Sequence, residues 1–230
     1  RQISDAQRSL LVQPSDLPEA SFSVYYHSVH EAGGDFYDVV PVSDGVYFYL
    51  MADVAGHDVG TSYVTPAVKV LLKQFATPAF AVEETIAYMH GILSKTVLQE
   101  NYLTAFALRV NKRAGKAVYL SAGHPPALYL PKNGEVRFLS CENPFIGMVD
   151  EFSYRSETMD IEEGDRFILY TDGLVEVGPV KKTWADSFED LLPHADLLRS
   201  LPREEVAGAI VRCLGAENPD DDVAVLVVEV

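Results

Sequence analysis

The pattern of apolar and polar positions along the chain predicts two groups of strands with helices between and after them. Short runs rich in β-branched and aromatic residues, each bounded by turn residues, are typical of strands. The first group comprises residues 22–29, 35–42 and 46–54, with a hairpin turn at Ser43-Asp44-Gly45. The second group comprises residues 103–111, 116–123, 126–131, 135–140, 152–161 and 165–173, and residues 222–230 form a final buried strand.

Helical periodicity marks the remaining segments. Residues 61–76 form a largely apolar helical window, and residues 82–100 carry apolar side chains on one helical face. Helices are also predicted at residues 5–12, 187–200 and 202–214. Strands joined by short hairpins, without regular alternation of strand and helix, predict an antiparallel α+β fold. We therefore expect an α-β-β-α sandwich, in which two stacked, mainly antiparallel sheets are flanked by helix pairs.

Composition fits one globular domain and excludes several classes of protein. The chain has 230 residues, of which 48% are hydrophobic, and no apolar run of about 18 residues that could span a membrane. A formal net charge of −16 argues against nucleic-acid binding, because phosphate would be repelled. Cys141 and Cys213 lie far apart and away from histidine pairs, which indicates neither a disulfide framework nor a zinc site. We expect a reducing, cytoplasmic location and no membrane contact by this segment.

Four acidic sites share one pattern along the chain. Asp35 follows two glycines in GGDFYD, and Asp53 ends an apolar strand before AGHDVG. Asp172 ends the apolar run FILYTDG, while Asp221 and Asp222 open the last strand in NPDDDVAVL. Each adjoins a glycine or a turn that lets another part of the backbone come close.

Several carboxylates at the edge of a core point to a cation. They lose solvation and repel one another, so they stay ionised together only beside a positive charge. Oxygen ligands suit Mg²⁺ or Mn²⁺. Two such ions, roughly 3.5–4 Å apart, can share a bridging water and lower its pKa, which supplies a nucleophile. Each aspartate taken alone is more often a turn residue, and acidic charge alone is explained by solubility.

Five segments in this order resemble one family: GGDFYDV, ADVAGHDVG, SAGHPPALYL, GDRFILYTDGLVEV and DDVAVLVVEV. They are similar to the SpoIIE-type (RsbU-like) branch of the bacterial metal-dependent protein phosphatases (PPM), the protein phosphatase 2C family. The resemblance covers almost the whole chain, from about Ala20 to Val230. Residues 20–230 are therefore expected to form the phosphatase domain, and residues 1–19 the end of an N-terminal linker helix with its connection. The family fold agrees with the predicted order of elements.

The resemblance implies a protein serine/threonine phosphatase that uses two Mn²⁺ or Mg²⁺ ions. Carried over by motif, Asp35 and Asp53 would bind the first ion together with the backbone carbonyl of Val54. Asp53 would also reach the second ion, which Asp172 and Asp221 would complete. These aspartates would act in catalysis through a water that bridges the two metals.

Four further residues adjoin the expected ligands. Asp222 and His57 would lie just behind them, and His57 is either a general acid for the leaving oxygen or a residue that stabilises its loop. His124, in Gly-His-Pro-Pro, is interpreted first as part of a rigid turn. Glu176 either orients a ligand or faces solvent.

The chain departs from the family pattern at two positions. Asp58 stands where glycine is usual, and Ala224 stands where threonine is usual. Neither change removes an expected ligand, but both could alter loop geometry or the hydrogen bonds behind the ligands. The helix at residues 61–76 follows the Asp53 loop directly, so it is a candidate switch that could move a metal ligand.

The resemblance also implies partners. The expected substrate is a phosphorylated anti-sigma-factor antagonist of the STAS type, released on dephosphorylation for partner switching. A sensor, receiver or coiled-coil segment upstream in the same chain would control activity and could promote a homodimer, so we expect weak activity from this segment alone. Two alternatives stay open: a catalytically weak regulatory module that binds a partner, and a phosphoesterase acting on a small molecule. Metal-dependent turnover tests the first, and a panel of phosphopeptides and nucleotides tests the second.

Overall fold

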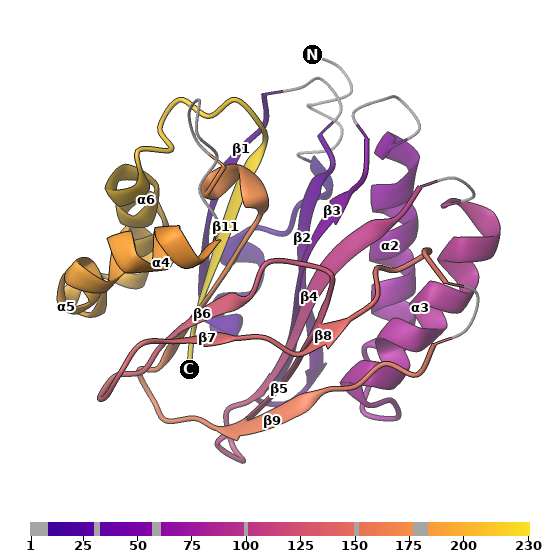
Figure 1. Cartoon of the computed structure of the whole chain (residues 1–230). Helices are drawn as coiled ribbons and strands as arrows, with labels where there is room; N and C mark the ends of the chain where they lie inside the picture. The colour runs from indigo at the N-terminus through magenta and orange to yellow at the C-terminus, as the bar shows by residue number, and fades with distance from the viewer. Residues whose placement is uncertain (1–8, 30–32, 57–60, 99–100, 150–151, 177–183) are drawn as a thin grey trace.

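The structure is a computed structural model that describes residues 9–29, 33–56, 61–98, 101–149, 152–176 and 184–230, with the backbone alone at residues 61, 62, 184, 187 and 188. Two β-sheets stack face to face, and helices cover the outer face of each (Figure 1). The named strand pairs are antiparallel except for one short parallel pair. The predicted α+β sandwich of two mainly antiparallel sheets flanked by helices is confirmed.

Both sheets place strands from distant parts of the chain side by side. The first sheet has the order β1-β11-β10-β6-β7 and the second β2-β3-β4-β5-β8, with β9 paired to β5. The first comprises β1 (Phe22–His27), β11 (Val223–Glu229), β10 (Arg166–Tyr170), β6 (Ala127–Leu130) and β7 (Arg137–Leu139). The second comprises β2 (Asp35–Ser43), β3 (Val46–Val54), β4 (Leu103–Asn111), β5 (Lys116–Ala122), β8 (Glu142–Asn143) and β9 (Glu157–Asp160).

Helices cover the outer faces of the two sheets. α2 (Thr61–Phe75) and α3 (Val82–Thr96) pack on the second sheet, and α6 (Arg203–Leu214) packs on the first. α4 (Trp184–Leu191) and α5 (Ala195–Ser200) lie beside α6. Four short 3₁₀ turns are η1 (Pro14–Asp16), η2 (Pro18–Ala20), η3 (Asp172–Leu174) and η4 (Leu192–His194). In the described part of the chain, no helix has the length and apolar character needed to cross a membrane.

Some predicted elements differ from the observed ones. The single helix expected at residues 187–200 is divided into α4, η4 and α5, because Pro193 lacks the N–H that a continuous helix needs. The strand expected at residues 152–161 shortens to β9, and the two-residue strand β8 was not indicated by the pattern. The helix expected at residues 5–12 lies mostly outside the described residues.

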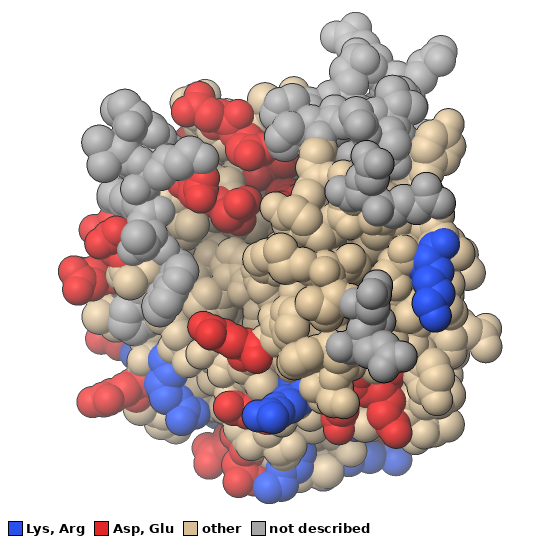
Figure 2. Space-filling model, turned by 45° about the vertical axis from the view of Figure 1, so that its right-hand side comes forward, with Lys and Arg blue, Asp and Glu red and all other residues tan. Residues whose placement is uncertain are grey.

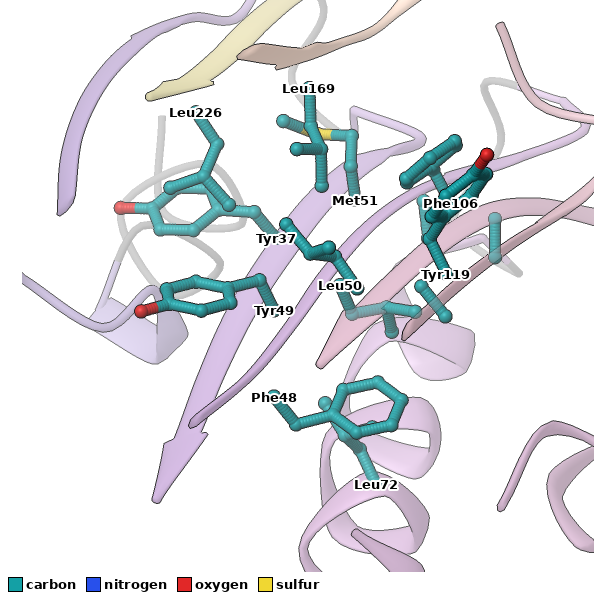
Figure 3. Packing of buried hydrophobic residues seen from close by; sticks show 14 of the residues in the cluster. Tyr37, Phe48, Tyr49, Leu50, Met51, Leu72, Phe106, Tyr119, Leu169 and Leu226 are labelled. Atoms are coloured by element: carbon teal, nitrogen blue, oxygen red, sulfur yellow. The ribbon is translucent and has the colours of Figure 1, made fainter. Parts of the chain in front are cut away.

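The central strands β3 and β4 of the second sheet are buried on both faces, because one face meets the first sheet and the other meets helices. In β3, residues 47–52 are all buried. Figure 3 shows the alternation that follows from strand geometry: Met51 points toward Leu169 of the first sheet, whereas Phe48 points toward Leu72 of α2. Each large apolar side chain buried in this way contributes about 2 kcal/mol.

Asp38 of β2 forms a buried ion pair with α2. Its side chain is 1% exposed, and Lys69 Nζ donates to its Oδ1 at 2.8 Å. Burial raises the pKa of Asp38, and the hydrogen bond and charge of Lys69 partly oppose that rise. Asp35 and Asp38 are three residues apart in one strand, so their side chains point to opposite faces of the sheet. Asp38 therefore faces the helices, and Asp35 faces the first sheet.

We expect Lys69→Met to lower the free energy of unfolding by about 3 kcal/mol near neutral pH, because Asp38 is left buried without its cation. Losing Lys69 raises the folded-state pKa of Asp38 further above the unfolded value. The stability deficit should therefore grow as the pH rises above the ordinary carboxyl pKa and shrink as the pH falls below it. Denaturant unfolding at about pH 4 and about pH 8 measures this, with exposed Lys95→Met of α3 as the control. Equal losses in the two variants would contradict the buried pair.

Candidate metal centre

Asp35 and Asp53 lie opposite each other at one end of the second sheet. Asp35 is the first residue of β2, Asp53 is the last but one of β3, and the two are partners in the antiparallel register. Partners in such a register have Cβ atoms about 4.5–5.5 Å apart. Two of the expected ligands, from motifs that are separate in the sequence, are therefore direct neighbours.

The other expected ligands reach the same end from the first sheet. Asp172 begins η3 and is separated from the end of β10 by Thr171 alone, while Asp221 and Asp222 directly precede β11, which pairs with β10. In Figure 1, the start of β2, the end of β3 and the start of β11 all lie toward the top of the view. Asp172 is exposed, Asp221 is half-buried and Asp222 is buried. The four aspartates expected as ligands thus meet at one end of the sandwich.

These carboxylates raise one another's pKa. Burial lifts the pKa of Asp35 well above its usual range, and the charge of Asp53 adds to the rise. Burial also raises the pKa of Asp53 to about 7. The charges of Asp172, Asp221 and Asp222 contribute to that second rise. Such repulsion falls when a cation lies among the groups, and an all-oxygen donor set suits a hard divalent ion.

Gly33 and Gly34 let the backbone pass close to the expected ligand atoms. A Cβ on Gly34 would lie 2.5 Å from Asp53 Oδ1 and 2.6 Å from the carbonyl oxygen of Val54. A Cβ on Gly33 would collide with the carboxylate of Asp222. The double glycine therefore forms a cradle around a carboxylate and a carbonyl, as oxygen ligation of a cation requires.

The donor atoms are neighbours without converging on one point. Among the described residues, no three Asp, Glu, His or Cys side chains are arranged to hold a single metal ion. Asp35 Oδ2 accepts a hydrogen bond from Thr171 Oγ1 at 2.6 Å, and Asp222 Oδ1 accepts one from Val29 N at 2.6 Å. The donor chemistry fits a divalent ion, and side-chain rotation would be needed to bring the oxygens onto it.

Thr171 joins the two sheets at this site, although the sequence analysis did not single it out. Its hydroxyl donates to Asp35 Oδ2 and accepts from Ala224 N at 2.9 Å. The side chain is 0% exposed. Thr171 therefore fixes Asp35 of β2 against β10 and β11. The sequence signal that could have found it is a hydroxyl residue at the end of the apolar run FILY, directly before Asp172.

His124 makes a second connection between the sheets. Its Nε2 lies 3.1 Å from the carbonyl of Tyr170, which can only accept, so Nε2 carries the hydrogen. Its Nδ1 therefore accepts from Thr104 Oγ1 at 2.8 Å. Burial lowers the pKa of His124 to about 3, so the ring is neutral at physiological pH. Thr104 is the β4 partner of Asp53, and the structure thus supports the interpretation of His124 as a structural residue.

The structure describes one of the two positions that depart from the family pattern, Ala224, but not the other, Asp58. The bond from position 224 to Thr171 uses the backbone amide, so alanine in place of the usual threonine leaves it intact. Asp58 lies outside the described residues, as does His57, whose expected role stays a prediction.

A cavity of about 860 Å³ opens beside Asp53 and Asp172. The Gly-His-Pro-Pro turn and several side chains of residues 140–148 line it. Glu176 also lines it, so this side chain faces the cavity next to the aspartates. The sequence analysis did not single out residues 140–148, because they have no acidic motif and no clear periodicity.

Comparison with protein-family models matches residues 43–230 to the stage II sporulation protein E (SpoIIE) family. The match covers most of the chain and includes Asp53, Asp172 and Asp221. The chain belongs to the SpoIIE family. Asp35 lies before the matched region, and its place beside Asp53 follows from the strand register.

This SpoIIE-family chain is also similar to individual proteins. It is 25% identical over 228 residues to the phosphoserine phosphatase RsbP of Bacillus subtilis (strain 168), a match that covers 97% of this chain and 56% of RsbP. The SiaA-PP2C domain of Pseudomonas aeruginosa has a TM-score of 0.80 at 22% identity, covering 100% of this chain and 94% of that one. The catalytic domain of the serine/threonine protein phosphatase PstP, solved with two manganese ions, has a TM-score of 0.65 at 15% identity, covering 90% and 96%. Both structural likenesses show the fold.

We expect Thr171→Val to lower the free energy of unfolding by about 2 kcal/mol, because the amide of Ala224 and the carboxylate of Asp35 both lose a partner. Mn²⁺ binding should weaken about tenfold, since Asp35 is no longer held in place. Thr171→Ser keeps the hydroxyl and should retain most of both properties. Denaturant unfolding and calorimetric titration with Mn²⁺ measure the two effects. Unchanged Mn²⁺ affinity in Thr171→Val would show that the hydroxyl serves stability alone.

Proposed function

We propose that this chain is the catalytic domain of a metal-dependent protein serine/threonine phosphatase. The observation that carries the proposal is the meeting of aspartates from both sheets beside an open cavity. Membership of the SpoIIE family supports it, as does the likeness to RsbP, which is named a phosphoserine phosphatase. In this proposal residues 20–230 are the phosphatase unit, and residues 1–19 are the preceding connection.

Two Mn²⁺ or Mg²⁺ ions are the proposed cofactors. Asp35, Asp53 and the carbonyl of Val54 would hold one ion, and Asp53, Asp172 and Asp221 would hold the other. Such ions, when bound, supply Lewis acidity to a water molecule and to phosphoryl oxygens. The glycine cradle around Asp53 and Val54 supports this ligand set, and PstP, of the same fold, was solved with two manganese ions.

We infer that water is the attacking group, in keeping with the hydrogen bonds that already engage Thr171 and His124 at this site. The Thr171 hydroxyl is buried and engaged with both Asp35 and Ala224. His124 is neutral, and both of its ring nitrogens are hydrogen-bonded. Thr171 therefore holds the carboxylate of Asp35, and His124 holds Thr104, the strand partner of Asp53. His57 stays the candidate acid for the leaving oxygen of serine or threonine.

The proposed substrate is a phosphorylated anti-sigma-factor antagonist of the STAS type, which dephosphorylation would release for partner switching. An upstream sensor, receiver or coiled-coil segment would regulate the domain, which could form a homodimer. We expect this domain alone to be weakly active. We place it in the cytoplasm, and the free thiols of Cys141 and Cys213 fit a reducing compartment.

Of the two adjacent acids before β11, we assign Asp221 to the metal and Asp222 to a supporting role. Asp222 is 3% exposed and already accepts a hydrogen bond from Val29 N. Asp221 is half-buried, and its Oδ1 accepts a hydrogen bond from the backbone amide of Asp222 at 2.8 Å, while the charges of both acids raise the pKa of Asp53. Asp222 would therefore hold the loop that carries the ligand.

We expect Mn²⁺-dependent hydrolysis of para-nitrophenyl phosphate, reduced roughly a hundredfold or more in Asp172→Asn, because the substitution removes a ligand charge with little change of shape. Asp160→Asn, at an exposed position of β9, is the matched control and should behave as the wild type. Turnover that needs no Mn²⁺, or that survives in Asp172→Asn, would contradict the proposal. If neither protein turns over substrate, calorimetry with Mn²⁺ decides, and absence of binding would also contradict it.

The neighbouring acids allow a second test. Asp221→Asn should weaken Mn²⁺ binding about tenfold or more, since a proposed ligand loses its charge. Asp222→Asn should weaken it less, because the amide oxygen can still accept the hydrogen bond from Val29. Calorimetric titration of both variants measures the difference. If Asp222→Asn weakened Mn²⁺ binding more than Asp221→Asn, Asp222 would be the ligand instead.

A further inference from the structure

The cavity beside the aspartates has an apolar wall. Pro125 and Pro126 of the Gly-His-Pro-Pro turn form part of it, and Phe145 and Met148 form the rest. Met148 is 58% exposed, and Tyr102, which stacks on Phe145, is 40% exposed. A contiguous exposed apolar group rimmed by polar residues marks a binding surface.

This wall is held firmly by its neighbours. The rings of Phe145 and Tyr102 stack with their centroids 5.0 Å apart. Phe145 also lies so close to Gly123 that a Cβ there would overlap its ring. Ile146 exchanges two backbone hydrogen bonds with Leu103, each 2.9 Å long. The loop after β8 therefore presents its apolar side chains from a fixed backbone, which lowers the entropy cost of binding.

The charged residues that line the cavity are all acidic among the described residues. Glu142 is exposed at its edge and Glu176 is half-buried, while Asp53 and Asp172 belong to the metal centre. No Lys or Arg lines the cavity in the part of the chain that the structure describes. Figure 2 shows Asp and Glu gathered at the upper left beside a hollowed, mainly uncharged surface, and further Asp and Glu mixed with Lys and Arg along the lower part of the view. A ligand with apolar and basic groups complements this surface.

We propose that this cavity is a docking groove for the substrate polypeptide around its phosphorylated residue. It selects an apolar side chain against Met148 and Phe145, and a basic side chain near Glu142. The inference rests on the proposed function, because the groove opens beside the same aspartates. It adds to that function which types of residue the substrate should carry next to its phosphorylated residue.

The apolar wall and the charge of the groove favour a polypeptide. Its volume of about 860 Å³ leaves room for groups on either side of a phosphorylated residue. A small phosphate ester would leave the apolar wall in contact with water. Beyond the proposed metal ligands, the further phosphates of a nucleotide would meet the carboxylates of Glu142 and Glu176, and acidic flanking residues would be repelled in the same way.

The test compares phosphoserine peptides that differ only in one flanking residue, Leu, Arg or Gly, placed on either side, with Mn²⁺ present. The wild type should have a kcat/KM about tenfold higher for the Leu peptide than for the Gly peptide. Met148→Ser should remove most of this preference, mainly by raising KM. Glu142→Gln should lower the preference for Arg about threefold and leave that for Leu unchanged.

Two matched variants control for unspecific effects. Leu197→Ser on α5 replaces an apolar residue of similar exposure, 49%, outside the groove. Glu163→Gln replaces an exposed glutamate between β9 and β10. Neither should change the Leu or Arg preference. All four replaced side chains are exposed, so every variant should unfold at the wild-type midpoint.

Hydrolysis of para-nitrophenyl phosphate shows whether a negative result contradicts the proposed groove or the proposed phosphatase activity. Turnover of that ester with equal kcat/KM for the three peptides would overturn the groove and leave the proposed function in place. A Leu preference that persists in Met148→Ser would also overturn it. If a second copy of the chain covers the surface instead, Met148→Ser would lower the oligomeric state in ultracentrifugation without changing peptide preference.

A binding measurement tests the groove even without turnover. Peptides of the same sequences that carry a non-hydrolysable phosphonate can be titrated by fluorescence anisotropy. Tighter binding of the Leu peptide to wild type than to Met148→Ser would support the groove independently of catalysis. Equal binding of the Leu and Gly peptides would contradict it.

Discussion

The hydrogen bond from Thr171 to Asp35 joins the two sheets at the end where the acidic residues meet. A carboxylate buried to 6% exposure in an apolar sandwich is costly unless a donor satisfies it, and Thr171 is that donor. The same hydroxyl accepts from Ala224, so β10 and β11 are fixed against β2 by a single side chain. The positions of the other proposed ligands depend on this connection, because Asp172 follows Thr171 directly and Asp53 is the register partner of Asp35.

The two helices on the second sheet contact two parts of this site: α2 contacts β2, and α3 contacts the loop that forms the groove wall. β2 carries Asp35 on the face toward the first sheet and Asp38, paired with Lys69 of α2, on the other. The adjacent helix, α3, holds the loop that forms the groove wall: His90 Nδ1 accepts from Gly147 N at 3.2 Å and lies 3.1 Å from the hydroxyl of Tyr154. The two acids of DFYD, Asp35 and Asp38, thus have different roles. Asp35 supplies charge to the proposed metal centre, and Asp38 fastens the sheet to a helix.

The sequence could predict the sandwich and the meeting of the aspartates, because both follow from local patterns. Apolar runs that end in Asp-Gly or Asp-Asp can be recognised within a few residues. The connections between sheets could not be predicted in this way, because Thr171 and Asp35 are 136 residues apart and His124 and Tyr170 are 46 apart. The groove wall is equally non-local, since Phe145 packs between Tyr102 and Gly123. The short strand β8 pairs through only two residues, which is too few to produce a recognisable period.

An acidic chain that acts on a phosphate ester must overcome repulsion of its own substrate. With a formal net charge of −16, the surface as a whole disfavours an anion, and salt screens only the long-range part of that effect. Cations at the aspartates would make the electrostatic potential positive where the phosphoryl group binds, and this effect would reach only a short distance. Affinity for the rest of a protein substrate must then come from contacts that tolerate the acidic surroundings. Apolar packing on Met148 and Phe145 is such a contact, because it does not depend on charge. A basic flanking residue is another, since it turns the acidic groove from an obstacle into an attraction.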